Sequence, residues 1–500
     1  MIRITGMNSG LDTEAMISEL SKAHSSKVTT LQKKQTRLEW KQEAWKNLNG
    51  KIYSLFSNTL SKLKFSDAYR KKTTTCSDST KATIVASAGA VNGSQSLTVD
   101  SLATAGYLTG ARIGDKGRYK ADSKVSELDA SLVGKTISVN GEDVTITEDT
   151  TMSSLAKELS DKGINASFDA TNQRFFLSAK ATGADNDFVL GGDADALAAL
   201  GFDYESNLDA DGEIIDKTGA VRIKGTNATI TLNGAEFTSD TNTFAINGLT
   251  VTVKGTTVPG ETLSINTETD YDGIYDTIKG FIKEYSDLMN EMTKLYNAAS
   301  NKSMDPLTDE EKDAMTDTQI EQWEEKIKSG ILSGDSTIAT VRNELSKIMM
   351  QPIEIGGEKI YLADYGIATG DYFSTEVDAR YAYHIDGDPD DQLTGSAEDK
   401  LKSAIAADPD AVAQFFQKLS NNLYTKLNDL MASTEYSSIY KVYDDKQMKS
   451  DLSDFEKKIQ EAQQKLADLE DKWYAKFAKM EAAMASMQNG QNSISALFGQ

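Results

Sequence analysis

Cysteine, histidine and proline are all scarce in this chain of 500 residues, which contains one cysteine, two histidines and five prolines. The lone Cys76 excludes an intramolecular disulfide and a cluster of thiolate metal ligands. With only His24 and His384, the histidine chemistry of zinc sites and catalytic dyads is nearly out of reach. So few prolines leave room for long, uninterrupted helices.

Long apolar runs are also missing. No stretch approaches the roughly 20 apolar residues that a membrane-spanning helix needs, so we expect no membrane span. The first six residues, Met-Ile-Arg-Ile-Thr-Gly, lack the basic segment and apolar core of a cleavable signal peptide. The protein is therefore expected either to stay inside the cell or to leave it by a route that reads no cleavable signal.

Positive charge is in short supply overall. The net charge is −23, which argues against a nucleic-acid partner because phosphate binding requires a basic face. Residues 1–72 nevertheless contain 14 Lys and Arg against 6 Asp and Glu, whereas residues 181–220 contain ten acidic residues and one base. Such runs usually solvate an exposed surface. The alternative is that the basic N-terminal segment docks on acidic helices further along the chain.

The motifs that would indicate an enzyme are not found. The sequence has no Gly-x-x-x-x-Gly-Lys-Ser/Thr phosphate loop and no Gly-x-Ser-x-Gly nucleophile elbow. Carboxylate pairs are unavoidable among 76 acidic residues and carry little information. We therefore expect no catalytic site and no cofactor.

One segment has the spacing of a calcium-binding loop. Asn207, Asp209 and Asp211 supply oxygen atoms at positions 1, 3 and 5, and Gly212 follows at position 6. Position 12 is Thr218, where a bidentate glutamate is needed, and no helix pair clearly flanks the loop. We favour the competing interpretation, an Asp/Gly turn between strands, and expect no metal.

Both ends of the chain are predicted to be helical. From Leu11 to about Leu63 there is no proline and a single glycine, and apolar residues recur every seven positions. Asp12 or Thr13 is the expected helix cap. Near the C-terminus a second stripe steps by three and four residues, the heptad pattern of a coiled coil. The residues predicted to pack these two helices together are Leu31, Leu38, Trp45, Ile52, Leu452, Phe455, Ile459, Leu466, Leu469 and Trp473.

The middle of the chain changes to the two-residue period of β-strands. Residues 136–146 alternate around Asn140-Gly141, which predicts a type I′ hairpin because both turn residues need a positive φ. Further turns are expected at Asn233-Gly234 and Asn247-Gly248, and a short helix within residues 151–163. Two more helices are predicted after the β-rich middle, near residues 274–298 and 396–430.

We therefore expect an α+β protein with a helical coiled-coil leg built from both chain ends and an inserted, β-rich, two-lobed head. The chain should enter and leave the head at neighbouring positions, as inserted domains require. The termini have too few apolar side chains to offset the cost of ordering the backbone, so they are expected to be flexible. The predicted parts are a flexible N-terminal segment (1–20), an N-terminal leg helix (21–72), an inner head domain (73–104 and 223–270), an outer head domain (105–222), C-terminal leg helices with a small β-hairpin (271–487) and a flexible C-terminal segment (488–500).

Several short blocks of sequence lie in order along the chain. They are Met7–Glu14 (Met-Asn-Ser-Gly-Leu-Asp-Thr-Glu), Tyr69–Thr75, Gly93–Ala103, Leu332–Thr337, Asp408–Phe416, Lys476–Met484 and Ile494–Phe498. In order and spacing they resemble the flagellar filament cap family (hook-associated protein 2), and residues 136–183 are similar to a module of flagellin-type heads. The stretch from Pro306 to Lys326 departs from the family pattern and is expected to lengthen the leg.

The resemblance implies a secreted, non-enzymatic assembly factor at the tip of the bacterial flagellum. Proteins of this family leave the cell unfolded through the channel of the flagellum, which suits the missing signal peptide and disulfide. They form a ring, typically a pentamer, whose legs contact the nascent filament while a plate above stops flagellin from diffusing away. The implied partners are further copies of the chain, flagellin and a flagellar export chaperone.

Two other functions stay open at this point. The acidic head would suit an adhesin that binds host mucin or another surface, and adhesion need not exclude capping. The chain would otherwise be a different axial component of the flagellum, such as a flagellin or a hook–filament junction protein. The blocks at the two ends of the sequence favour the cap over both.

Overall fold

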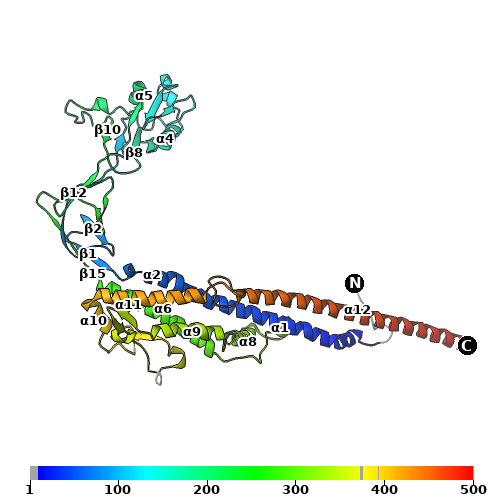
Figure 1. Ribbon diagram of the computed structural model, residues 1–500. Helices are drawn as coiled ribbons and strands as arrows, with labels where there is room; N and C mark the ends of the chain where they lie inside the picture. Colours follow the sequence, from blue (N-terminus) through cyan, green and yellow to red (C-terminus); the bar gives the residue numbers. More distant parts are fainter. Residues whose placement is uncertain (1–9, 372–374, 392, 499–500) are drawn as a thin grey trace. The chain divides into compact units, whose positions relative to one another are not determined.

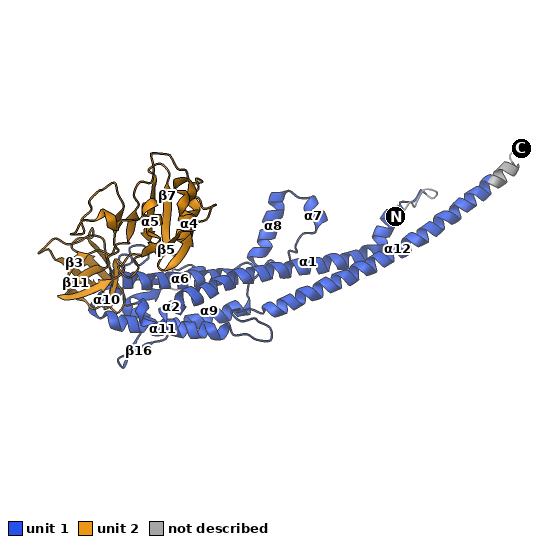
Figure 2. Cartoon of the chain, turned by 90° about the horizontal axis from the view of Figure 1, so that it is seen from above, with its two compact units in different colours: residues 1–69, 271–500 blue, residues 70–270 orange. Residues whose placement is uncertain are grey.

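The computed structural model describes residues 10–371, 375–391 and 393–498, with side chains described up to residue 492. The chain forms two compact units, residues 1–69 with 271–500 and residues 70–270 (Figure 2). We call the first unit the leg and the second the head. None of the helices in the described part of the chain has the length and hydropathy needed to cross a membrane.

The leg is mainly helical, and its elements are shown in Figure 1. Its helices are α1 (Thr13–Ser54), the π-helical η1 (Leu55–Leu60), α2 (Ser61–Leu63), η2 (Ser66–Ala68), α6 (Tyr271–Asn297), α7 (Asp309–Asp313), α8 (Asp317–Ser329), α9 (Ser336–Met349), η5 (Leu362–Tyr365), η6 (Val377–Ala379), α10 (Lys400–Ala407), α11 (Pro409–Leu430) and α12 (Asp445–Phe498). Two antiparallel strand pairs accompany them, β16 (Ile353–Ile355) with β17 (Glu358–Ile360) and β18 (Ile367–Thr369) with β19 (Tyr383–Ile385).

The helix starts follow local capping chemistry. The Asp12 side chain accepts a hydrogen bond of 2.9 Å from the backbone N–H of Ala15, so Asp12 caps α1. The single helix predicted over 396–430 is wrong, because α10 and α11 are separate helices. Asp408 caps α11, and Pro409 at the first helical position pushes the residue before it out of helical geometry.

One continuous core joins the leg helices. It takes buried side chains from the C-terminal half of α1 and from η1, α6, α9 and α11. Its largest fully buried residues are Trp45, Tyr69, Tyr285, Phe281, Phe415 and Phe416. Burial raises the pKa of the Tyr69 hydroxyl well above its ordinary value, so this group stays neutral beside Ser420, 3.0 Å away. Segments from both ends of the sequence therefore share one interior.

The head consists of short strands with a few helical turns. Its elements are β1 (Lys72–Cys76), β2 (Ala82–Ala86), β3 (Gly93–Ser101), β4 (Tyr107–Thr109), α3 (Val125–Leu128), η3 (Ala130–Leu132), β5 (Thr136–Val139), β6 (Glu142–Thr145), α4 (Met152–Asp161), β7 (Ile164–Asp169), β8 (Arg174–Ala179), β9 (Leu190–Gly192), α5 (Ala194–Ala199), η4 (Glu205–Asn207), β10 (Val221–Ile223), β11 (Ala228–Leu232), β12 (Ala235–Ser239), β13 (Thr243–Ile246), β14 (Leu249–Val253) and β15 (Leu263–Thr269).

Two separate hydrophobic cores divide the head into lobes. The inner core lies with the sheets β1-β15-β3-β11-β12 and β13-β14-β2, and the outer core with the sheets β10-β4-β8-β7 and β6-β5-β9. Buried residues of the outer core fall between Leu108 and Ala220, whereas those of the inner core come from both sides of this segment. The outer lobe is thus an insertion within the inner lobe.

The strands that lead into and out of the head are neighbours. β1 pairs antiparallel with β15, in register from Lys72 opposite Thr269 to Cys76 opposite Ile265. This pairing confirms the prediction that the chain enters and leaves the head at adjacent positions. Because these strands are neighbours, the chain leaves the leg after residue 69 and returns to it at residue 271 by adjacent paths.

The three predicted Asn-Gly turns are confirmed. Both residues of each turn have positive φ: 51° and 84° at Asn140-Gly141, 51° and 83° at Asn233-Gly234, and 45° and 80° at Asn247-Gly248. They connect β5 to β6, β11 to β12 and β13 to β14. Asparagine and glycine tolerate this left-handed geometry, which matches the twist of the flanking strands.

A half-buried ion pair lies at the junction between the two lobes. The Asp187 carboxylate accepts hydrogen bonds from the Arg222 guanidinium and from the backbone N–H groups of Gly225 (3.0 Å) and Phe188 (2.9 Å). The guanidinium also lies 4.0 Å from the ring centre of Phe188. Partial burial by itself raises the pKa of the Asp187 carboxyl, but these hydrogen bonds outweigh it and hold the pKa below its ordinary value of 3.8.

We expect Arg222→Met to lower the free energy of unfolding of the head by about 1–3 kcal/mol, because the half-buried Asp187 carboxylate would lose its charged partner. The folded pKa of Asp187 is depressed, so the stabilisation is complete above about pH 4 and is lost as the pH falls through the folded pKa. Urea unfolding followed by circular dichroism measures the loss. All four tryptophans lie in the leg, so the fluorescence transition is an internal control and should not move. An equal loss at pH 7 and pH 2.5 would contradict the assignment.

Candidate functional site: the paired helices of the leg

The two longest helices, α1 and α12, lie antiparallel beside each other (Figure 1). Near the end of α1, Trp45 stacks on Tyr443, just before α12 begins, with ring centroids 5.3 Å apart. Farther along the pair, Leu31 of α1 and Ala462 of α12 line the same groove. The first and last helices of the sequence therefore pair within one chain.

The residues predicted to pack this pair are covered to different extents. Trp45, Ile52 and Ile459 are buried. Seven others are half-buried: Leu31, Leu38, Leu452, Phe455, Leu466, Leu469 and Trp473. A helix that has one long neighbour leaves one flank of its apolar stripe open to solvent. The pair consequently presents a long, partly exposed apolar stripe on the leg.

Asn49 is a key contact that the sequence analysis missed. Its side chain is 2% exposed, donates to the carbonyl of Tyr440 (3.1 Å) and accepts from the N–H of Val442 (3.0 Å). Tyr440 has a φ of 65°, which is rare for a bulky residue. A polar residue on the buried face of a heptad helix was the available signal, because such a residue needs a specific partner.

Basic side chains of α1 meet acidic residues of the later leg helices. The ammonium of Lys33 lies 2.8 Å from Glu311, that of Lys41 3.2 Å from Asp335, and that of Lys51 2.6 Å from Glu291. Lys33 and the N–H of Thr308 hold the pKa of the Glu311 carboxyl below its ordinary value. These contacts confirm the alternative that the basic N-terminal segment docks on acidic parts of the chain.

The segment expected to lengthen the leg instead forms two short helices on its side. α7 and α8 project beside α1 in Figure 2. α6 ends at Asn297, and Thr308 and Thr316 each begin a new helix with a capping box, so the segment does not extend α6. Arg37 donates hydrogen bonds to the carbonyls of Met304 and Asn301, and Lys328 lies 4.5 Å from the ring centre of Trp40.

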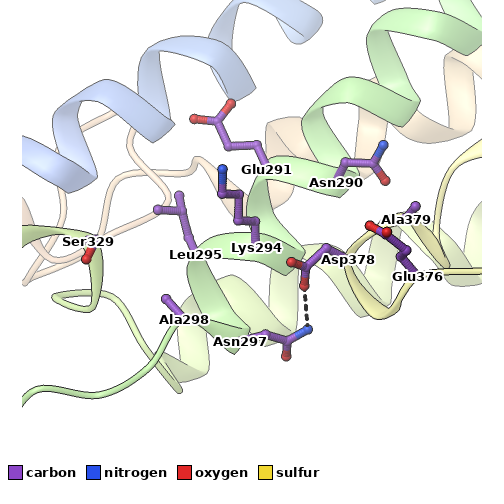
Figure 3. Close-up of a pocket in the computed structure, with 10 residues that line it drawn as sticks. All are labelled: Asn290, Glu291, Lys294, Leu295, Asn297, Ala298, Ser329, Glu376, Asp378 and Ala379. Atoms are coloured by element: carbon purple, nitrogen blue, oxygen red, sulfur yellow. Dashed lines mark hydrogen bonds between the residues drawn. The ribbon is translucent and has the colours of Figure 1, made fainter. Parts of the chain in front are cut away.

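A cavity of about 730 Å³ lies among α6, the end of α8 and η6 (Figure 3). Lys294, Glu291, Glu376 and Asp378 are among its lining residues, and Asn297 donates to Asp378 over 3.1 Å. The labelled residues include no histidine or cysteine. The hydroxyl of Ser329 donates to the carbonyl of Lys326, so these lining residues do not form a nucleophile–base pair.

The candidate calcium loop is closed by its own hydrogen bonds. Asn207 accepts from the N–H of Asp216 and donates to two backbone carbonyls. The Asp209 carboxylate accepts from the N–H groups of Asp211 and Glu213, both at 2.9 Å. Across the residues that the structure describes, no group of three or more Asp, Glu, His or Cys side chains is placed to hold a metal ion. The loop is built as an Asx-type turn.

The sequence matches two models of one protein family. The model described as "Flagellar hook-associated protein 2 C-terminus" matches residues 225–489, and the N-terminus model matches residues 9–106. The chain belongs to the flagellar hook-associated protein 2 family. This membership confirms the resemblance found in the sequence. The chain is therefore a filament-capping protein, located at the tip of the bacterial flagellum.

Named relatives match this chain over most of its length. Flagellar hook-associated protein 2 of Halalkalibacterium halodurans is 23% identical, covering 99% of this chain and 100% of the relative. The A-type protein of Pseudomonas aeruginosa is 26% identical, covering 81% of this chain and 79% of the relative. A crystal structure of the D1-D2-D3 domains of the flagellar cap protein FliD from Escherichia coli shares the fold, with a TM-score of 0.51 and 18% identity over 82% of this chain and 99% of that one.

We expect Trp45→Ala to destabilise the leg by about 3–5 kcal/mol, because Trp45 is 1% exposed and its removal leaves a cavity beside Tyr443. Trp323→Ala is the matched control, since this side chain is 36% exposed and should cost about 1 kcal/mol. Urea unfolding followed by circular dichroism compares the two variants. Similar losses in both would show that the Trp45 contact does not anchor the helix pair.

Flexibility of the termini stays a prediction. α1 begins at Thr13 and α12 reaches Phe498, while residues 1–9 and 499–500 lie outside the described residues. α12 continues past the start of α1 (Figure 2), and Met487 is 76% exposed. We expect amide hydrogen exchange in residues 488–498 of the isolated chain to be fast, because an unpartnered helix end frays. Protection there equal to that of residues 455–465 would refute the prediction.

Proposed function

We propose that this chain caps the filament as a ring of identical subunits, with the pair of helices α1 and α12 as the working part. The observation that carries the proposal is the half-buried apolar stripe along this pair. Apolar surface on paired long helices is stabilised when a further helix covers it. Neighbouring copies and incoming flagellin supply such helices at the filament tip.

The finer assignments follow from the same surface. We infer a pentameric ring, the arrangement that the family resemblance implies. The ring retains flagellin monomers until they join the filament, so a strain without the cap leaks flagellin. Before export, the end of α12 beyond α1 is the segment that we expect a flagellar export chaperone to cover. Covering exposed apolar side chains at this end, such as Met487, would keep them from aggregating inside the cell.

The outer lobe can be removed at a defined point. Thr104 and Thr226 pair through two backbone hydrogen bonds of 3.0 and 3.2 Å, so a short Gly/Ser linker can replace residues 106–224 without separating the strands of the inner lobe. We expect this variant to restore swimming to a cap-deficient strain, at reduced efficiency. Deletion of residues 449–500 should restore nothing and should leave flagellin monomers in the medium.

A point-variant pair separates loss of capping from loss of folding. Leu466→Asp with Leu469→Asp places charge on the half-buried stripe, while Gln460→Asp with Ala467→Asp changes exposed positions of the same helix. The stripe variant should leak flagellin and the control should not, with both retaining helical circular dichroism. Equal complementation by the outer-lobe and C-terminal deletions would mean that the helices are not the working part. Adhesion through the head, to host mucin or another surface, would then be the better proposal.

A further inference from the structure

A basic groove runs between α1 and α12 at a level where neither helix is covered by the leg's central core. It has a volume of about 320 Å³ and is lined by His24, Lys27, Leu31, Lys458, Glu461, Ala462 and Lys465. Ala462 is buried and Leu31 half-buried, so the groove has an apolar floor. Three lysines and one glutamate surround this floor, which is unusual in a chain of net charge −23.

The three lysines have no carboxylate partner in the described part of the chain. Salt bridges within the leg join other basic residues, such as Lys33, Lys41 and Lys51, to acidic ones, but none includes Lys27, Lys458 or Lys465. Concentrated like charge beside an apolar floor raises the electrostatic potential locally and attracts a surface of opposite charge. The groove is therefore suited to an acidic partner that also carries an apolar residue.

The acidic face of the α7–α8 segment has this chemistry. Residues 305–325 contain nine acidic residues and one lysine. Two of the acids are already neutralised within the chain, Glu311 by Lys33 and Glu324 by Lys312 and Lys328. The remaining seven are exposed: Asp305, Asp309, Glu310, Asp313, Asp317, Glu321 and Glu325.

Apolar side chains lie among these acids on α8. Ile320 lines a shallow depression of about 520 Å³ together with Asp317, Glu321 and Glu325, and Trp323 is 36% exposed. The indole N–H of Trp323 donates to the carbonyl of Asp305, which holds the ring in place. Fixed aromatic side chains are enriched in protein interfaces because little entropy is lost when they are covered.

We propose that the basic groove of one copy binds the acidic face of α8 from a second copy of this chain. The inference rests on the proposed homo-oligomeric cap and names a surface for it. Within one chain the two surfaces do not meet, because Lys33, Arg37 and Trp40 tie the α7–α8 segment to α1 farther along the helix. Each copy therefore has one unsatisfied surface of each sign.

Two different surfaces on one subunit create a directional contact. Each copy offers its groove to one neighbour and its α8 face to the other, a heterologous arrangement that closes into a ring when the rotation between copies permits. The groove lies about ten residues from the α8 attachment along α1, or about 15 Å at 1.5 Å per residue. Copies side by side thus need only a modest axial offset for the two surfaces to meet.

Charge reversal with rescue tests the pairing in the full-length protein. The groove variant carries Lys27→Glu, Lys458→Glu and Lys465→Glu, and the α8 variant carries Asp317→Lys, Glu321→Lys and Glu325→Lys. We expect either variant alone to weaken self-association at least tenfold in sedimentation velocity at 50 mM salt. An equimolar mixture of the two variants should associate again, as oligomers in which the variants alternate. A reversed groove then faces a reversed α8 at one contact, and an unchanged groove faces an unchanged α8 at the next. Raising the salt to 500 mM should weaken the wild-type contact, because the Debye length shortens.

Matched controls separate this contact from a general effect of charge. Lys449→Glu, Lys472→Glu and Lys479→Glu change exposed lysines elsewhere on α12, and Glu205→Lys, Asp211→Lys and Glu213→Lys change exposed acids of the outer lobe. Both control sets should associate like the wild type. Carbodiimide crosslinking of the wild type should join groove lysines to α8 carboxylates only in oligomers, as identified by mass spectrometry.

The outcomes distinguish the inference from the proposed function. Wild-type oligomers that are unaffected by both charge-reversed variants, or variants that do not associate when mixed, would overturn the groove–α8 contact and leave the homo-oligomer standing. A wild-type chain that stays monomeric at every salt and concentration, and that fails to stop flagellin leakage, would overturn both. Flagellin leakage is the independent readout of capping.

Discussion

The packing of α1 against α12 is the contact on which the rest of the leg depends. The two helices come from opposite ends of the sequence, so each can bury its apolar stripe only after the whole chain has returned to its starting point. Trp45 stacks on Tyr443 in the loop between α11 and α12, and the buried Asn49 forms hydrogen bonds with the backbone of the same loop. An apolar stripe alone permits helices to slide, whereas a buried polar residue with a fixed partner specifies one register.

That constraint also explains why the head can be an insertion. The strands that begin and end the head, β1 and β15, pair with each other. The head therefore interrupts the sequence of the leg but not the packing of its helices. The outer lobe is inserted into the inner lobe in the same way, because the backbones of Thr104 and Thr226 hydrogen-bond to each other where the chain enters and leaves it. Each lobe keeps a core of its own. Variation in the outer lobe can therefore leave the leg's interior unchanged.

Charge is distributed in a way that a single chain only partly satisfies. Three lysines of the basic N-terminal helix α1 form ion pairs with acidic residues of α6, α7 and the turn before α9. The groove between α1 and α12 and the outer face of α8 keep unpaired charge of opposite sign. Exposed single ion pairs contribute little to stability. Clustered, complementary surfaces act instead on the rate and the specificity of association, which suits a protein that must find identical neighbours.

Local patterns account for what the sequence alone determined. The Asn-Gly turns, the Asp12 cap and the heptad stripes depend on residues within a few positions of each other, so they could be predicted without knowledge of the fold. The family blocks added the function. Tertiary structure decided the rest: the unequal burial of Leu31, Leu38 and Leu466 against Trp45 and Ile52, the docking of α7 and α8 on the side of α1, and the lysine groove. These features depend on which distant segment covers a given side chain, and the spacing of residues along one helix contains no information about its neighbours.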